Sequence, residues 1–304
     1  MHFIKPNLSI KTGLLLFLII IPGITYGQCH KGAVFCKDTH SAIGFVNIGI
    51  IGKNVGTVSD ESGYFTLALD NANNDDSLRF SMIGYEPKCF LVSKFKENLI
   101  KEVFLNPTSY NLHEVKVTYH KNREVKIGTE VTSNLLRSGF SDNALGSELG
   151  IKVETRGKVR LDDINLNVAT CTFDSVTYRL NIYQSASEDE DDDSTYKNIL
   201  TQPIYITFSK DMIDRVIKVD LKKYSIIVEG NILVTLELFR DMGDGRLLFH
   251  TEFFKGTTYH RKAIEGKWAG SPGIIGMYLH GQKLKSEPHH SKNAILAADI
   301  KQLP

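Results

Sequence analysis

A run of six acidic residues is the segment of this sequence that most directly suggests metal chemistry. It consists of Glu188, Asp189, Glu190, Asp191, Asp192 and Asp193. Calcium prefers several carboxylate oxygens as ligands, so the run is a candidate calcium site. It lacks the alternating Asp/Asn and glycine order that fixes a calcium loop, and repulsion between like charges favours an exposed loop. We expect a solvated loop, with calcium as the alternative and no other cofactor.

Three residues near the C-terminal end form a candidate ligand-binding group. Trp268, the only tryptophan, lies in a stretch rich in glycine, serine and proline, and Tyr259 and Arg261 come shortly before it. Aromatic side chains beside an arginine often bind a partner molecule such as a sugar or a protein. We predict a ligand-binding site at these three residues. The alternative is that Trp268 fills the end of a sandwich core.

Motifs for known catalytic mechanisms are missing. The nearest approach to a serine nucleophile, at residues 270–273, lacks the required spacing, and the sequence has no phosphate-binding loop. His113 and Glu114 are adjacent on an expected strand, so their side chains point to opposite faces and cannot bind one metal. His289 and His290 stand in a polar tail with no further ligand nearby. We therefore assign no catalytic residue and predict a protein that is not an enzyme.

A glycoside hydrolase remains the alternative, because its two carboxylates are usually far apart in sequence. The acidic residues on or near expected strands are Glu148, Glu154, Glu229, Glu237 and Glu252. No feature of the sequence selects a pair among them.

Residues 1–27 have the pattern of a signal peptide. Lys5 and Lys11 precede an apolar run at residues 13–21, and the segment ends at Gly27, a small residue suited to cleavage. The apolar run is shorter than the roughly 20 residues that span a bilayer, which disfavours an uncleaved anchor. Gln28 precedes the first cysteine where a lipid-anchored protein would have a small residue. We expect export to the periplasm, the outer-membrane surface or the medium.

Length and composition indicate an ordinary globular chain of about two domains. The 304 residues are 42% hydrophobic and 23% charged, with a formal net charge of +1. This near-neutral charge argues against a dedicated nucleic-acid binder. No other segment is apolar enough to cross a membrane. Four cysteines, Cys29, Cys36, Cys89 and Cys171, lie beyond the signal peptide, and the sequence does not decide whether or how they pair.

Short alternating strands separated by turns occupy most of the remaining chain. In the first half the expected strands include residues 45–50, 64–69, 78–82, 99–105 and 112–118, with a turn at residues 60–63. The polar segment 120–128 is the expected linker. In the second half the apolar residues of 164–168, 176–182, 204–208 and 232–238 alternate with residues expected to face solvent, and residues 131–140 are a candidate short helix.

Several linked motifs in the first half resemble a known family. They are AIGFVNI at residues 42–48, GTVSDESGYF at 56–65, LRFSMIGYE at 78–86 and LHEVKV at 112–117. Together they resemble the carboxypeptidase-regulatory-like domain of Bacteroidetes envelope proteins. The resemblance implies a seven-stranded, prealbumin-like sandwich without catalytic residues. In that group the domain often precedes the plug of TonB-dependent transporters, whose large barrel this chain is too short to contain.

The resulting domain prediction is a signal peptide at residues 1–27, a prealbumin-like sandwich at 28–119, a linker at 120–128 and a jelly-roll-like β-sandwich at 129–304. The predicted function is a non-catalytic binding or scaffold protein of the cell envelope, whose partner is an envelope protein or a glycan. The alternatives are a glycan-active hydrolase and an accessory subunit of an outer-membrane transport system.

Overall fold

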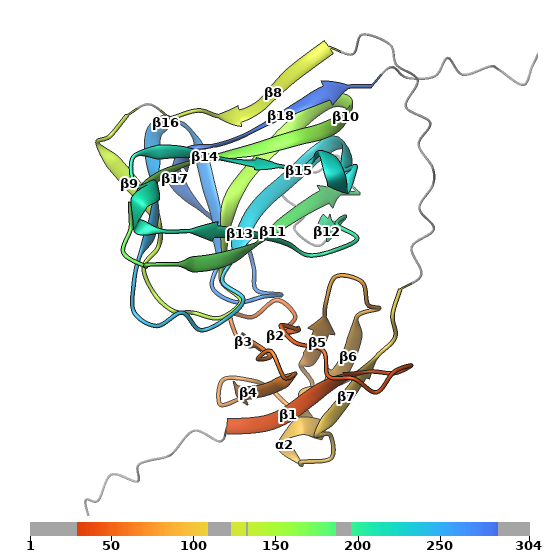
Figure 1. The fold of residues 1–304 in the computed structure, drawn as a ribbon. Helices are drawn as coiled ribbons and strands as arrows, with labels where there is room; N and C mark the ends of the chain where they lie inside the picture. Colours follow the sequence, from red (N-terminus) through yellow and green to blue (C-terminus); the bar gives the residue numbers. More distant parts are fainter. Residues whose placement is uncertain (1–28, 109–122, 132, 187–195, 285–304) are drawn as a thin grey trace, which may run out of the picture.

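The structure, a computed structural model, describes residues 29–108, 123–131, 133–186 and 196–284. Within these ranges the chain forms two β-sandwiches, one of them smaller and N-terminal (Figure 1). The helical elements of these ranges are α2 (Val92–Lys96) and two short 3₁₀ turns, η2 (Lys210–Met212) and η3 (Lys222–Tyr224). The predicted all-β fold class is confirmed.

The N-terminal sandwich has seven strands between residues 29 and 108. They are β1 (Cys29–Cys36), β2 (Asn47–Ile50), β3 (Gly56–Val58), β4 (Tyr64–Ala68), β5 (Ser77–Ser81), β6 (Lys88–Leu91) and β7 (Glu102–Leu105). One sheet has the order β4-β1-β7 and the other β3-β2-β5-β6. The alternation expected along β4 and β5 is present, because Phe65, Leu67, Leu78 and Phe80 all face one apolar core. The predicted seven-stranded sandwich is confirmed.

The predicted turn at residues 60–63 shows why its sequence is so specific. One carboxylate oxygen of Asp60 accepts hydrogen bonds from the backbone N–H groups of Ser62 and Tyr64, both at 2.9 Å. Gly63 adopts a positive φ of 80°, and a Cβ there would lie 2.8 Å from the carbonyl oxygen of Val34. The side chain of Asp60 therefore closes the turn, and only glycine fits its last position.

Eleven strands form the second sandwich within the described residues. They are β8 (Arg123–Thr129), β9 (Leu136–Phe140), β10 (Glu148–Cys171), β11 (Val176–Ser185), β12 (Tyr196–Asn198), β13 (Ile204–Phe208), β14 (Arg215–Asp220), β15 (Ile227–Glu237), β16 (Leu247–Arg261), β17 (Ala269–Ile275) and β18 (Met277–Lys283). Hydrogen bonds join all of them into one sheet that folds over itself, so the layers are not two separate sheets.

The long strand β10 passes from one layer of this sandwich to the other. Its first part pairs with β15 and with the end of β16, and its second part pairs with β14 and β18. The register with β15 shifts between Thr155 and Val159, where the strand bends. A large apolar core fills the space between the layers. Glu148 begins β10 and Arg261 ends β16, and the two residues are register partners.

The outer face of β11 and β15 differs from its sequence prediction. The alternating apolar side chains in segments 176–182 and 232–238 face the core as expected. The residues between them were expected in solvent, yet Arg179, Asn181, Thr235 and Glu237 are all at most 2% exposed. The expectation of solvent exposure is therefore wrong on these two strands, because the N-terminal sandwich covers their outer face. It is also wrong on β10, where Asn165 and Asn167 are buried and Asn167 donates to the carbonyl oxygen of Val131.

Two smaller predictions are also wrong in the described residues. Residues 123–128, expected in the linker, belong to β8, which pairs along its length with β18. Residues 131–140 were a candidate helix, but residues 136–140 form strand β9, which pairs with β16. Phe140 of β9 packs against Tyr178 with ring centroids 4.5 Å apart, so core packing accounts for the extended conformation.

Several predictions lie outside the described residues. They concern the signal peptide at residues 1–27, the last expected strand of the first half at 112–118, the acidic run at 188–193 and the C-terminal tail.

All four cysteines have free thiols in the structure, with Cys29 and Cys89 exposed and Cys36 and Cys171 buried. No helix in the described ranges is long and apolar enough to span a membrane.

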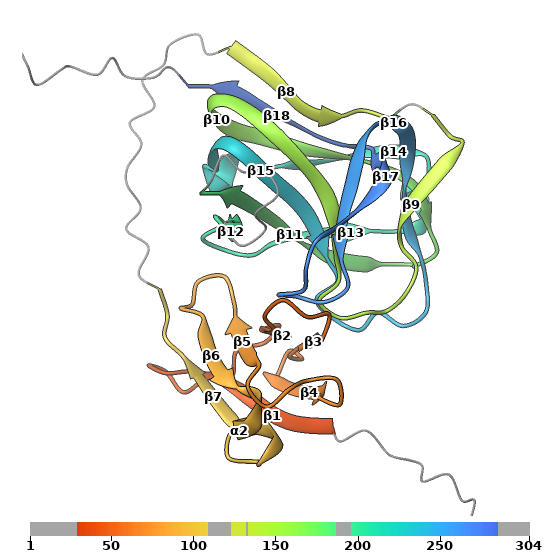
Figure 2. The same cartoon turned by 180° about the vertical axis from the view of Figure 1, so that it is seen from behind.

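The N-terminal sandwich meets the second sandwich through Phe45 and strands β2, β3 and β5 (Figures 1 and 2). The second sandwich contributes β11 and the loops that follow β15 and β16. The backbone N–H of Gly52 donates to the carbonyl oxygen of Glu265 at 2.8 Å. A Cβ at Gly49 would lie 2.2 Å from the carbonyl oxygen of Ile264, so this contact requires glycine. The rings of Phe45 and Phe239 meet edge to face at 4.9 Å.

Candidate functional site

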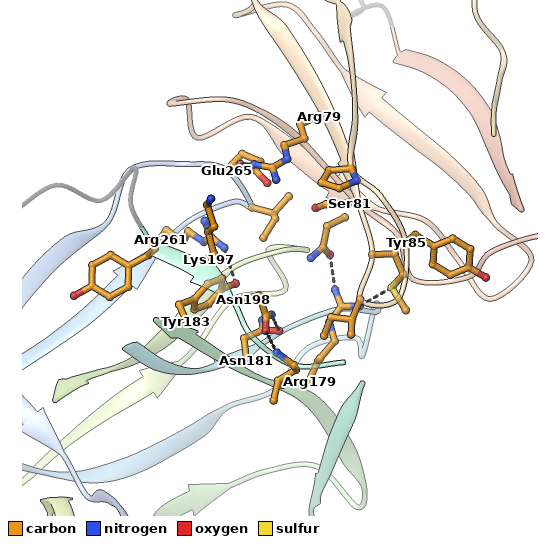
Figure 3. Close-up of a pocket in the computed structure, with 17 residues that line it drawn as sticks. Arg79, Ser81, Tyr85, Arg179, Asn181, Tyr183, Lys197, Asn198, Arg261 and Glu265 are labelled. Carbon is orange, nitrogen blue, oxygen red and sulfur yellow. Dashed lines mark hydrogen bonds and ion pairs between the residues drawn. The ribbon is translucent and has the colours of Figure 1, made fainter. Parts of the chain in front are cut away.

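A cleft of about 510 Å³ lies between the two sandwiches. The N-terminal sandwich lines it with residues that include Arg79, Ser81 and Tyr85, and the second sandwich with residues that include Asn181 and Asn198. Figure 3 shows Arg79, Ser81, Asn181 and Asn198 around one shared space, whereas the ring of Tyr85 points away from it. Because both sandwiches contribute, the cleft exists only when they are in contact.

Four charged residues form a row across the outer face of the second sandwich, beneath this cleft. Arg179 of β11, Glu237 of β15, Glu148 of β10 and Arg261 of β16 are register partners on adjacent strands. Side chains at such positions lie about 5 Å apart on one face. The order of charges along the row is therefore positive, negative, negative, positive, and the formal charges cancel. Each of the four residues is at most 9% exposed.

The outer arginine–glutamate pairs of this row are joined by several hydrogen bonds. Arg179 donates to both carboxylate oxygens of Glu237, at 3.0 and 2.6 Å. Arg261 donates through Nε to Glu148 Oε1 at 3.0 Å, and through Nη2 to the same oxygen. Buried ion pairs are tolerated only with such geometry, because both ions have lost their water.

Asn181 and Tyr183 connect the row to the cleft. The amide nitrogen of Asn181 donates to Glu237 at 2.7 Å and to Glu148 at 3.3 Å. The hydroxyl of Tyr183 lies 3.0 Å from Glu148 Oε1 and accepts from Arg261 Nη2 at 2.9 Å. Asn198 in turn donates to the amide oxygen of Asn181 at 2.9 Å. The polar groups at the floor of the cleft therefore have fixed orientations.

The pKa values of the two glutamates are shifted in opposite directions. Burial raises the pKa of Glu148 above its ordinary value, and Arg261 only partly offsets this effect. Burial also acts to raise the pKa of Glu237, but the charge of Arg179 and its hydrogen bonds outweigh it, so the pKa is lowered. The negative charge is therefore firmly held on Glu237, the glutamate that pairs with Arg179.

Arg179 also joins the two sandwiches. Its Nη1 donates to the backbone carbonyl of Phe45 at 2.9 Å, and its Nη2 donates to the side chain of Asn47. Phe45 has a positive φ of 60°, which is unfavourable for an aromatic residue. The neighbouring structure must stabilise this backbone conformation. The conformation in turn points the carbonyl group of Phe45 toward Arg179.

Comparison with known families identifies the smaller sandwich. Residues 30–117 match the family model of the CarboxypepD_reg-like domain. The resemblance inferred from the sequence motifs is thereby confirmed for this domain, which is under a third of the chain.

The remaining comparisons found little. A search of curated proteins gave no match. One solved structure, of the cysteine protease and lectin-like domains of Cwp84, a surface layer associated protein of Clostridium difficile, is similar at 10% identity and a TM-score of 0.36. The match covers 85% of this chain and 59% of that one. We infer nothing from so distant a likeness.

The three residues predicted to bind a ligand all lie on the face of the second sandwich that meets the CarboxypepD_reg-like domain. Arg261 lines the cleft, although the ion pair with Glu148 engages two of its nitrogens. Trp268 is half-buried and packs on the Arg261 guanidinium, 4.5 Å from the ring centroid, and lies outside the apolar core clusters. Tyr259 contacts Lys152, whose ammonium lies 4.5 Å from its ring centroid.

Two of the five candidate glycosidase carboxylates come together in the structure. Glu148 and Glu237 share the amide group of Asn181, whereas Glu154 and Glu229 are exposed elsewhere and Glu252 pairs with Lys255. Neither Glu148 nor Glu237 lines the cleft, and protein donors occupy the oxygens of both. The pair is therefore positioned to hold the arginines rather than to reach a substrate.

The candidate metal ligands of the sequence cannot be placed. The acidic run Glu188–Asp193, the His113–Glu114 pair and the His289–His290 pair all lie outside the described residues. Among the residues that the structure describes, no group of three or more His, Cys, Asp or Glu side chains is arranged to hold a metal ion.

Sequence reasoning missed most of the cleft. Arg179, Asn181 and Tyr183 occupy alternate positions of β11 and were expected to face solvent. An arginine and an asparagine alternating with Tyr178, Leu180 and Ile182 are compatible with any exposed strand face. The one signal in the sequence that could have indicated an ion pair was the opposite charge of Glu237, at an alternate position of β15. The register of β15 with β11 cannot be derived from the sequence.

Proposed function

We propose that this protein is a non-catalytic binding protein of the cell envelope whose ligand is a saccharide, bound in the cleft between the CarboxypepD_reg-like domain and the second sandwich. One observation carries the proposal: polar side chains of both domains line a cleft of about 510 Å³, and a buried network fixes those on its floor. Ligand sites typically have such a preformed, concave shape.

The lining suits the hydroxyl groups and ring faces of a sugar. Asn181, Asn198 and Ser81 provide amide and hydroxyl groups, and Tyr183 and Tyr196 add aromatic surface. Side chains already fixed by hydrogen bonds lose little conformational entropy when a ligand binds. A weakly hydrophobic ligand can therefore gain affinity from several hydrogen bonds at once.

Envelope localisation rests on the sequence. Residues 1–27 have the charge, apolar run and small terminal residue of a signal peptide, and the motifs of residues 42–117 are those of a domain family found in envelope proteins. The same resemblance leaves an accessory role in an outer-membrane transport system as the alternative, since a saccharide-binding subunit would serve such a system.

A hydrolase is the second candidate, because the pKa values of Glu148 and Glu237 are shifted apart as in many acid–base pairs. Against it, both carboxylates are at most 1% exposed and lie beneath the cleft floor. Binding without turnover is therefore the favoured function.

The test is binding of the protein to an array of oligosaccharides and peptides, with and without calcium. Ser81→Trp fills the cleft, since Ser81 lines it from the end of β5. Thr66→Trp places the same side chain on an exposed position of β4 and is the matched control. We expect Ser81→Trp to abolish saccharide binding and Thr66→Trp to leave it unchanged.

Three results would change the proposal. Binding that survives Ser81→Trp would place the site elsewhere. Cleavage of a bound oligosaccharide, lost in Glu148→Gln, would favour the hydrolase. Binding of peptides only would favour a scaffold whose partner is another envelope protein.

A further inference from the structure

The cations that line the cleft are not fully neutralised by the described residues around them. Four basic side chains line it, those of Arg79, Arg179, Arg261 and Lys197, against a single acid, Glu265. The buried carboxylates of Glu148 and Glu237 offset two of the arginines. One positive charge remains in excess among these residues.

Lys197 carries that excess at the rim. It lies on β12, opposite Gln184 of β11, and its side chain is exposed. No carboxylate of the described residues lies within ion-pair distance of it. Its ammonium group lies at the mouth of the cleft, where it can donate hydrogen bonds to a ligand.

Two arginines add further donors toward the same space. Arg79 contacts Glu265 through Nη1 alone, at 3.3 Å, and its side chain is 36% exposed. A single long contact of this kind at a half-exposed site contributes little and leaves most of the guanidinium free. Arg261 uses Nε and Nη2 on Glu148, so its Nη1 has no hydrogen-bond partner among the described residues.

We infer that the saccharide bound in this cleft is acidic, with a carboxylate group that Lys197, Arg79 and Arg261 recognise. This inference rests on the proposed function and specifies its ligand class. A carboxylate accepts hydrogen bonds from guanidinium and ammonium groups, which are stronger than those between neutral partners. Without an anion, desolvation of these cations by a neutral sugar would cost binding free energy.

The experiment compares acidic saccharides with the same molecules after methyl esterification. The panel contains short oligomers of galacturonic, glucuronic and mannuronic acid, each beside its methyl ester, and neutral oligosaccharides. Esterification removes the charge and keeps the sugar skeleton. We expect binding to the acids, a loss of at least about tenfold in affinity on esterification, and weaker binding at higher ionic strength.

Three variants place the charge recognition at Lys197. Lys197→Gln should weaken binding of the acid about tenfold and leave binding of the ester unchanged, whereas Lys197→Arg should retain affinity for the acid. Lys31→Gln, an exposed position on β1 away from the cleft, is the matched control and should bind as the unmodified protein does.

The outcomes separate this inference from the proposed function. Equal affinity for acids and esters, or binding of neutral oligosaccharides only, would overturn the acidic ligand and keep the saccharide-binding cleft. Binding of acids that is unaffected by Lys197→Gln would also overturn the inference as stated. Absence of binding to every saccharide, acidic or neutral, would refute the proposed function itself.

Discussion

Replacing Arg179 by methionine should destabilise the whole protein strongly. The guanidinium of Arg179 donates twice to Glu237, and it also bonds to Phe45 and Asn47 of the other domain. Methionine keeps much of the apolar stem but leaves the carboxylate of Glu237 buried, with Asn181 as its remaining strong donor. Removing one partner of a buried ion pair typically costs about 3–5 kcal/mol.

The free energy of unfolding, measured by urea denaturation, tests this magnitude. A loss of about 3–5 kcal/mol corresponds to a fall in melting temperature of roughly 6–20 °C for a chain of this size class. Arg79→Met is the matched control, because it removes another interdomain arginine whose ion pair with Glu265 is half-exposed. That variant should lose no more than about 1 kcal/mol.

A double-mutant cycle with Glu237→Gln distinguishes the ion pair from general packing loss. If the ion pair stabilises the protein, Arg179→Met should reduce the free energy of unfolding by less in the Glu237→Gln background than in the unmodified protein. In that background no buried carboxylate charge is left without its partner. A loss below about 1 kcal/mol for Arg179→Met alone, or equal losses for the two arginine variants, would refute the reasoning.

The other predictions concern the two glutamates, the tryptophan and the turn. The raised pKa of Glu148 means that its contribution to stability falls as pH rises above the ordinary value of 4.5, so Glu148→Gln should be less destabilising at about pH 8 than at about pH 5. The lowered pKa of Glu237 has the opposite sign, so the cost of Glu237→Gln should shrink as pH falls below 4.5. Urea denaturation across pH checks both, and parallel pH curves would contradict them. Trp268→Leu should cost about 0.5–2 kcal/mol through loss of the cation–π contact, measured by thermal unfolding. Gly63→Ala should cost at least about 1–2 kcal/mol because of its positive φ, and an unchanged melting temperature would be evidence against the turn geometry.

The architecture of the smaller domain was largely predictable from its sequence. Asp60 and Gly63 specify a turn through local hydrogen bonds and backbone conformation, and alternation along β4 and β5 specifies which side chains are buried. Such signals depend on only a few neighbouring residues, so they can be recognised in the sequence without knowledge of the fold. The same is true of the core-facing residues of β11 and β15.

The cleft was much less predictable, because it depends on contacts between distant segments. Glu148 and Glu237 are 89 positions apart in sequence, and strand register decides that they are neighbours. Burial of Arg179 depends on a second domain covering an otherwise ordinary strand face. The three residues predicted from local composition do lie near this face, but the aromatic pattern gave no indication of the ion pairs beneath it.

Hydrogen–deuterium exchange with a bound saccharide tests the location of the site most directly. We predict that the ligand slows exchange in residues 79–87 of the CarboxypepD_reg-like domain and in residues 196–200 of the second sandwich, because both segments line the cleft. Slower exchange confined to one domain away from the cleft, such as the loop at residues 241–245, would contradict an interdomain binding site.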